Sequence, residues 1–208
     1  MTVNESPLLS LVVASYLFDY PNGAKNREWK FLRAIESAIN QTFKDFEIII
    51  VADGCIRTKL LFDKHYSGHG FIKLVEIEKQ TAYSSKVRNA GIESATGEYI
   101  TYLDTDDMIG KHHLETIAEN VSSYDWIWYD DYLMDNSFKH HYNKCFLKYG
   151  KCGTSNITHK RDIAVKWTRS GYSFDDWSFI QSLMKIPNHA KVATPEYFIC
   201  HQPRRVDV

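Results

Sequence analysis

Short apolar runs recur along the first 130 residues, and segments with helical periodicity separate them. Strands are predicted at 8–15, 46–52, 71–76, 98–103 and 126–129. Helices are predicted at 28–43, 57–66, 84–95 and 113–121. The strand runs are apolar almost without a break, which is typical of strands covered on both faces. This alternation predicts an α/β fold with a doubly wound, mainly parallel central sheet flanked by helices.

The pattern becomes irregular after Asp130. A hairpin is predicted within 132–145, helices at 161–169 and 176–185, and a last strand within 191–200. We find no internal repeat and no linker-like segment, so residues 1–208 are expected to form one domain. The regular half, about 8–107, is typical of a nucleotide-binding unit. The irregular half, about 108–208, is where we expect a substrate-specific face.

Composition and charge narrow the class of protein. Hydrophobic residues make up 44% and charged residues 25% of the 208 positions, as in ordinary globular domains. The net charge of -1 provides no overall attraction to nucleic acid, so no nucleic-acid partner is expected. Aromatic residues, at 14%, are plentiful enough to stack on bases or sugar rings as well as to fill a core.

The cysteines and the N-terminal segment bear on cellular location. The four cysteines form no C-x-x-C pair, so a thiolate zinc site is not expected and we interpret them as reduced. The apolar stretch from Leu8 to Phe18 is short, is broken by Ser10 and Ser15, and follows no basic residue. It predicts a buried strand and neither a signal peptide nor a membrane span. Together these features favour a cytoplasmic protein.

Acidic residues follow two of the predicted strands. Asp53 ends the second strand, and the D-x-D run Asp104-Thr-Asp-Asp107 follows the fourth. Ligands of open α/β sheets bind at the carboxyl ends of the strands. Ser15 and Tyr16 follow the first strand and are therefore expected at the same edge. A solvated acidic turn is one interpretation of the run. Because carboxylates at one edge repel each other unless a cation lies between them, the pattern favours a divalent metal with phosphate ligands.

The segment after the first strand argues against a dinucleotide-dependent dehydrogenase, because it contains no G-x-G-x-x-G motif. The phosphate charge of a ligand would instead be offset by a metal and by cations such as Lys86 and Arg88. For Arg88 we favour an ion pair with Asp104 or Asp106 over a contact with phosphate, since such a pair would hold the metal ligands in place.

Four ordered motifs carry more specific information. The first is Ile35-Glu-Ser-Ala-Ile-Asn-Gln-Thr-Phe-Lys-Asp-Phe-Glu-Ile-Ile-Ile-Val-Ala-Asp-Gly54. The second is Ser85-Lys-Val-Arg-Asn-Ala-Gly91, followed by Gly97-Glu-Tyr-Ile-Thr-Tyr-Leu-Asp-Thr-Asp-Asp107. Asp175-Asp-Trp177 is similar to an E-D-W element, and Tyr197–His201 is similar to a terminal Y-R-x-H element. In this order, the motifs resemble glycosyltransferase family two, most clearly over residues 8–125.

The resemblance implies a GT-A fold, whose central sheet is Rossmann-like, and inverting transfer of a hexose from a nucleotide sugar to an acceptor hydroxyl. The cofactor would be Mn²⁺ or Mg²⁺. The donor would bind the half at 8–107, and a carbohydrate or other hydroxyl acceptor would bind the half at 108–208. A UDP-sugar, such as UDP-glucose, is the expected donor because Asp53 suits an imide donor such as uracil.

The resemblance also implies roles for single residues. The donor would contact Ser15, Tyr16, Asp53, Lys86, Arg88, Asp104, Thr105 and Asp106. The metal ligands would be Asp106, His201 and Asp104. The catalytic base would be Asp176, with Asp175 as the alternative, and it would take the proton of the acceptor hydroxyl as that hydroxyl attacks. A purely structural interpretation of Asp176 is a helix N-cap.

The chain departs from the family pattern in four places. One is the arginine of Y-R-x-H, which is not at its usual place before His201. Ala14-Ser15 stands in place of Pro-Thr, Ala52 in place of the first aspartate of D-D-G, and Asp175 in place of the glutamate of E-D. The change at Ala52 keeps open a nucleotide-sugar-binding protein without transfer activity. A sugar nucleotidyltransferase is a further alternative. That class usually carries a Gly-rich loop and a basic residue after the first strand, where this chain has Tyr16-Leu-Phe-Asp-Tyr20.

Overall fold

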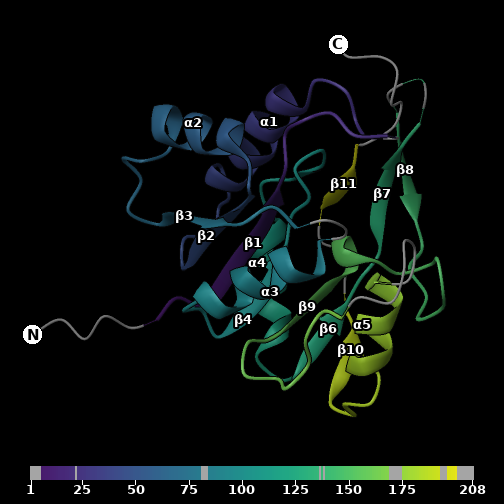
Figure 1. The fold of residues 1–208 in the computed structure, drawn as a ribbon. Coiled ribbons are helices and arrows are strands. Elements are labelled where there is room, and N and C mark those ends of the chain that lie inside the picture. Colours follow the sequence, from purple (N-terminus) through teal and green to yellow (C-terminus); the bar gives the residue numbers. More distant parts are fainter. Residues whose placement is uncertain are drawn as a thin grey trace, which may run out of the picture.

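A seven-stranded sheet runs through the centre of the molecule, with helices on both of its faces (Figure 1). The computed structural model describes residues 6–21, 23–80, 84–135, 137, 139–168, 175–192 and 196–200. Within them, the strands of the central sheet follow the order β10-β6-β9-β4-β1-β2-β3. Neighbouring strands are parallel except at β9, which runs antiparallel to both β4 and β6.

Strands and helices alternate over residues 9–128, as the sequence predicts. The strands of the central sheet are β1 (Leu9–Ser15), β2 (Phe46–Asp53), β3 (Ile72–Ile77), β4 (Tyr99–Tyr102), β6 (Trp126–Trp128), β9 (Ile157–Lys160) and β10 (His189–Lys191). A smaller sheet, in the order β5-β11-β7-β8, contains β5 (Met108–Ile109), β7 (Asp131–Met134), β8 (His140–Asn143) and β11 (Tyr197–Ile199). The helices are α1 (Arg27–Ile39), α2 (Ile56–His65), α3 (Ser85–Ser94), α4 (His113–Val121), α5 (Asp175–Leu183) and the 3-10 helix η1 (Thr154–Asn156).

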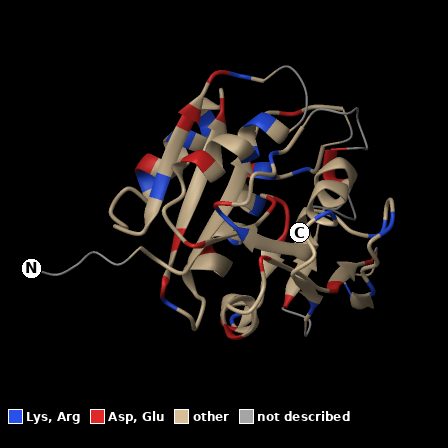
Figure 2. Cartoon of the chain, turned by 90° about the horizontal axis from the view of Figure 1, so that it is seen from below, with Lys and Arg blue, Asp and Glu red and all other residues tan. Residues whose placement is uncertain are grey.

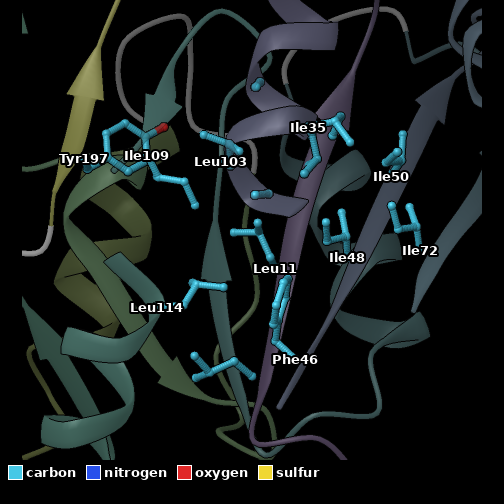
Figure 3. Packing of buried hydrophobic residues seen from close by; sticks show 14 of the residues in the cluster. Leu11, Ile35, Phe46, Ile48, Ile50, Ile72, Leu103, Ile109, Leu114 and Tyr197 are labelled. Atoms are coloured by element: carbon cyan, nitrogen blue, oxygen red, sulfur yellow. The ribbon is translucent and has the colours of Figure 1, made fainter. Parts of the chain in front are cut away.

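Strand β1 is covered on both faces, in agreement with its nearly continuous apolar sequence. Leu11 and Val13 pack with residues of α1, α2 and α4 in one hydrophobic cluster, whereas Val12 belongs to a second cluster with residues of α3 and α5. Figure 3 shows part of the first cluster, in which side chains of β1 and β2 meet Ile35 of α1. Because helices occupy both faces, the carboxyl edge of the strands is the part of the sheet left to contact ligands.

Helix α3 lies directly against β1 and β2. A Cβ atom at Gly91 would lie 2.4 Å from Cγ1 of Val12 and 3.3 Å from Cγ2 of Val51. Glycine is therefore required at this position for the helix to approach the sheet so closely. Arg88, one turn earlier on α3, is thereby brought close to the central sheet and is buried.

The helix predicted at 161–169 is wrong, because its described part, residues 161–168, contains turns, bends and chain without regular secondary structure. Ile163, Val165 and Trp167 reach the second hydrophobic cluster, and their spacing of two residues is that of extended chain. The backbone N–H of Arg161 donates to the carbonyl oxygen of Glu98, which ties the start of this segment to the sheet. Packing against the core thus prevails over local helical propensity here.

Three other predicted elements can be compared with the structure. The helix predicted at 28–43 ends at Ile39, because Gln41 and Thr42 bond to the backbone at Gly110 and Lys111 instead of continuing the helix. The hairpin predicted within 132–145 is confirmed as the antiparallel pair β7 and β8. The strand predicted within 191–200 is confirmed as β11, and the same range also includes Lys191, the last residue of β10.

The surface combines both signs of charge. Lys and Arg are interspersed with Asp and Glu over the molecule as seen in Figure 2, in keeping with the net charge of -1. In the part of the chain that the structure describes, none of the helices has the length and apolar character that a membrane span requires.

Candidate active site

The carboxyl ends of β1, β2 and β4 meet at one edge of the central sheet. Strand β1 lies between β2 and β4 and is parallel to both, so Ser15, Asp53 and Asp104 come to the same edge. Gly54 makes the turn after β2 with a φ of 57°, which favours glycine. A Cβ atom there would lie 2.7 Å from the backbone nitrogen of Lys79. Gly54 thus allows the segment after β3 to approach the end of β2.

The Asp53 carboxylate is nearly buried and has two donors from the segment after β3. The ammonium of Lys79 lies 2.5 Å from Oδ2, and the backbone N–H of Gln80 donates to Oδ1 over 2.6 Å. The same ammonium lies 3.9 Å from the centroid of the Tyr16 ring, a cation–π contact. Lys79 was not identified from the sequence, although it follows a strand that ends at the same edge. Asp53, Lys79 and Tyr16 therefore form one polar and aromatic cluster.

Ser15 and Tyr16 differ in what they present at this edge. The Ser15 hydroxyl is buried and lies 2.8 Å from the hydroxyl of Thr58 on α2, so it points into the molecule. The Tyr16 side chain is half-buried, and the Arg27 Nε donates to the Tyr16 carbonyl oxygen over 3.0 Å. Of these two predicted contacts with a base, only the Tyr16 side chain has an exposed surface of its own.

Arg88 connects the two halves of the chain. Its Nη2 lies 3.3 Å from Oδ1 of Asp104, and its Nη1 lies 3.5 Å from Oδ1 of Asp176. The ion pair with Asp104 is one of the two predicted for this arginine. Burial disfavours the charge of Arg88, but Asp104 and Asp176 outweigh it and raise the pKa of the guanidinium. The arginine therefore stays charged and holds a carboxylate of each half. Lys86, two residues earlier, is exposed on α3.

Asp175 and Asp176 occupy the first turn of α5 in contrasting surroundings. Asp175 is buried and accepts a hydrogen bond from the Ser85 hydroxyl over 2.6 Å, which ties α5 to α3. The Asp176 side chain is 44% exposed and accepts a hydrogen bond from the Thr154 hydroxyl over 3.1 Å. Burial raises the pKa of the Asp176 carboxyl, and Arg88 opposes this rise. The arrangement favours Asp176 over Asp175 as the group that meets a ligand.

The aspartates after β4 are divided between exposed and buried positions. Asp104 and Asp106 are half-buried, whereas Thr105 and Asp107 are buried. The Tyr197 hydroxyl donates to Asp107 over 3.1 Å, and the Cys200 N–H donates to the same carboxylate over 2.7 Å. Burial and the charges of the two neighbouring aspartates raise the pKa of Asp107 well above its usual range. Asp107 thus anchors β11, and Asp104 and Asp106 are left as the candidate ligands.

The predicted metal site is incomplete within the described residues. Among them, no group of three or more His, Cys, Asp or Glu side chains is arranged to hold a metal ion. His201, the third predicted ligand, lies outside the described residues. Asp104 and Asp106 supply the carboxylate oxygens that a hard divalent cation prefers, so the residues present fit such an ion when further ligands are added.

The sequence matches a known family. The family described as Glycosyl transferase family 2 matches residues 24–176, which include the ends of β2 and β4 and the start of α5. The uncharacterized glycosyltransferase YibD of Escherichia coli (strain K12) is 31% identical over 184 residues, covering 86% of this chain and 48% of that protein. The putative glycosyltransferase EpsH of Bacillus subtilis (strain 168) is 36% identical over 118 residues, covering 56% of this chain and 31% of that protein.

The fold matches solved structures as well. The structure of S. aureus TarS 1-349 in complex with UDP-GlcNAc superimposes with a TM-score of 0.69 at 18% sequence identity, over 92% of this chain and 58% of that chain. The complex of the same protein with UDP superimposes equally well. The fold is thus the GT-A fold implied by the sequence motifs. The chain spans less than half the length of the two curated relatives named above.

Proposed function

Because this chain belongs to glycosyl transferase family 2, we propose that it transfers a hexose from a UDP-sugar to an acceptor hydroxyl with inversion at the anomeric carbon. The observation that carries the proposal is the linkage of Asp104 and Asp176 through Arg88. One carboxylate lies at the strand edge where a donor would bind. The other is partly exposed beside it, where an acceptor could approach.

Asp53 and Tyr16 would recognise the base of the donor. A uracil ring presents an N3–H donor, and the Asp53 carboxylate has lone pairs beyond those used by Lys79 and Gln80. Cytosine presents an acceptor at the same ring position, so the carboxylate would disfavour it. The half-buried Tyr16 ring offers an apolar surface beside this carboxylate. The structural neighbour forms complexes with UDP and with UDP-GlcNAc, which supports a uridine nucleotide here.

The diphosphate would lie near Asp104 and Asp106. These carboxylates, together with His201, would hold Mn²⁺ or Mg²⁺, which would offset the charge of the departing UDP. Lys86, exposed on α3, would add a positive charge near the same phosphates. Thr105 is buried between the two aspartates, and its role would be to fix the turn that presents them.

Asp176 would act as the base. As the acceptor oxygen forms its bond to the anomeric carbon, the bond from that carbon to the diphosphate oxygen breaks, and the acceptor proton passes to Asp176. The raised pKa of this carboxyl suits a proton acceptor. Trp177 follows on α5, and its ring centroid lies 6.5 Å from that of Tyr149, which is half exposed. This aromatic pair would stack on a sugar ring of a carbohydrate acceptor.

A panel of nucleotide sugars tests the proposal. Ligands that bind the folded state raise the melting temperature. We expect UDP and UDP-hexoses to do so more than the corresponding GDP or CDP compounds. We also expect at least one UDP-hexose to release UDP in the presence of Mn²⁺ and a carbohydrate acceptor, and EDTA to stop the release. Binding without any UDP release would instead indicate a nucleotide-sugar-binding protein. No shift with any uridine nucleotide would contradict the proposal.

A further inference from the structure

The guanidinium of Arg88 rests on an aromatic side chain that belongs to neither motif around it. Its central carbon lies 4.6 Å from the centroid of the Trp167 ring. Trp167 comes from the segment before α5, which the sequence motifs do not cover. We infer that Trp167 is a positioning residue that holds Arg88 between Asp104 on the donor side and Asp176 on the acceptor side. This inference rests on the proposed function.

Trp167 is itself fixed from several directions. Its ring stacks on Phe179 of α5, with 3.9 Å between centroids and 7° between planes, so the guanidinium takes the opposite face. Its backbone N–H donates to the Asn89 side-chain oxygen over 3.0 Å, and its carbonyl accepts from the Asn89 amide over 2.8 Å. Asn89 follows Arg88 on α3. One turn of α3 therefore carries Arg88 and also, through Asn89, fixes the backbone of Trp167.

A buried hydrogen-bond chain links the indole to the central sheet. The Trp167 Nε1–H donates to the Tyr102 hydroxyl over 3.0 Å, and this hydroxyl lies 2.7 Å from His159 Nε2. The His159 Nδ1 lies 2.8 Å from the carbonyl oxygen of Lys160, which can only accept, so Nδ1 carries the ring proton. Burial lowers the pKa of His159 to about 4 and keeps the ring neutral. The Tyr102 hydroxyl then donates to Nε2, and each group in the chain is satisfied.

This arrangement makes the position of Arg88 depend on Trp167. The arginine is buried, and the described charged groups that act on Asp176 are Arg88, Asp104 and Asp175, with the Thr154 hydroxyl as a further donor. Only the arginine carries positive charge among them. If the guanidinium shifts away, the remaining charges all disfavour the ionised form of Asp176. A substitution at Trp167 should therefore raise the pKa of Asp176, although no hydrogen bond joins the two described side chains.

The test compares Trp167→Leu with Trp167→Phe and with a control, Trp126→Leu. Trp126 is equally buried but stacks on His189, away from Arg88. In Trp167→Leu we expect kcat to fall by about 10–100-fold with little change in donor KM, as for loss of a residue that orients a functional group. The acid limb of the pH–kcat/KM profile should move to higher pH. Trp167→Phe keeps an aromatic face under Arg88 and should restore most of the activity and the profile.

The control variant distinguishes an effect on the position of Arg88 from a general loss of fold stability. Trp126→Leu should lower the melting temperature without moving the pH profile. A wild-type profile in Trp167→Leu would overturn the inference. Should Trp167→Leu not fold, Trp167→Met, which fills more of the space, replaces it in the same comparison.

A second measurement does not depend on transfer activity. The carboxyl ¹³C signal of Asp176, assigned with Asp176→Asn, should titrate at higher pH in Trp167→Leu than in the wild type. An unchanged titration would overturn the inference even if the wild type transfers no sugar. A raised titration in a protein that shows no transfer would instead contradict only the proposed function.

Discussion

Asp53 receives two hydrogen bonds from the protein, from Lys79 and from the Gln80 N–H, and both fix its carboxylate at the end of β2. A fixed, nearly buried acceptor of this kind discriminates between ligands by their hydrogen-bond donors. The neighbouring Tyr16 ring supplies surface without such discrimination. At the scale of single residues, the proposed preference for uridine thus depends on Asp53.

Removal of the Asp53 carboxylate should reduce that preference. Asp53→Ala is expected to weaken UDP binding by about 1–3 kcal/mol, the range for a buried polar group that loses its partner. CDP binding should change much less. Calorimetric titration of both nucleotides measures the difference. An equal loss of affinity for UDP and CDP would show that Asp53 does not read the imide.

The proposed role of Asp106 in metal binding can also be tested by a single substitution. Its backbone oxygen accepts a hydrogen bond from Arg33 over 2.6 Å, and this contact survives in Asp106→Ala. The variant should bind UDP equally in Mn²⁺ and in EDTA, whereas the wild type should bind UDP more tightly in Mn²⁺, because a carboxylate ligand of the ion is lost. A wild-type response to Mn²⁺ in the variant would show that Asp106 is not a ligand of the proposed metal site.

At the scale of elements, Glu47 joins the start of β2 to three neighbouring segments. Its carboxylate accepts from the Ser10 hydroxyl of β1 over 2.7 Å and from the Thr96 N–H before β4 over 2.6 Å, and it pairs with Lys73 of β3 at 2.6 Å. Burial by itself would raise the pKa of Glu47, but these donors lower it to about 2. The strands that carry the site are thus tied together at their opposite ends.

Acid should therefore weaken the sheet through Glu47. Its folded-state pKa lies below the usual 4.5, so the ionised group stabilises the fold above about pH 4.5 and loses this effect as the pH falls toward 2. The effect amounts to about 3 kcal/mol at most. In urea unfolding, Glu47→Gln should be less stable at pH 7, and its stability should fall less between pH 5 and pH 3.

A matched variant shows whether the buried hydrogen bonds of Glu47 are the cause. Glu93 pairs with Lys166 at the surface, and its side chain is 64% exposed. Glu93→Gln should therefore unfold like the wild type at every pH. If Glu47→Gln and the wild type showed the same slope with pH, the lowered pKa of Glu47 would be contradicted.

At the scale of the whole molecule, the parts that follow from local pattern could be predicted from the sequence. Apolar runs and helical periods predict the sheet and its helices, and parallel strands bring Asp53 and Asp104 to one edge. Ser15 could be placed at that edge too, but the alternation of a strand turns it to the same face as Leu11 and Val13, toward α2. Which face that alternation selects depends on packing.

The contacts that complete the site depend on approach between distant segments. Lys79 reaches Asp53 because Gly54 permits it, and Trp167 reaches Arg88 across 79 positions of the chain. The anchoring of β11 by Asp107 spans a similar separation. Periodicity and spacing contain no information on such pairs, which is why the interpretation of residues 161–169 as a helix missed the position of Trp167.

The central claim is that Asp176, which lies in the second half of the chain, is the catalytic base. It acts on an acceptor that attacks a donor bound by the first half. Turnover of a UDP-sugar by Asp176→Asn, measured beside Asp175→Asn, tests this claim most directly. Asparagine keeps the size of the side chain and can accept the bond from Thr154, but it cannot take up a proton. We predict that Asp176→Asn lowers turnover by about 10²–10⁴-fold while UDP affinity and melting temperature barely change. Asp175→Asn should remain active, and near-normal transfer by Asp176→Asn would contradict the claim.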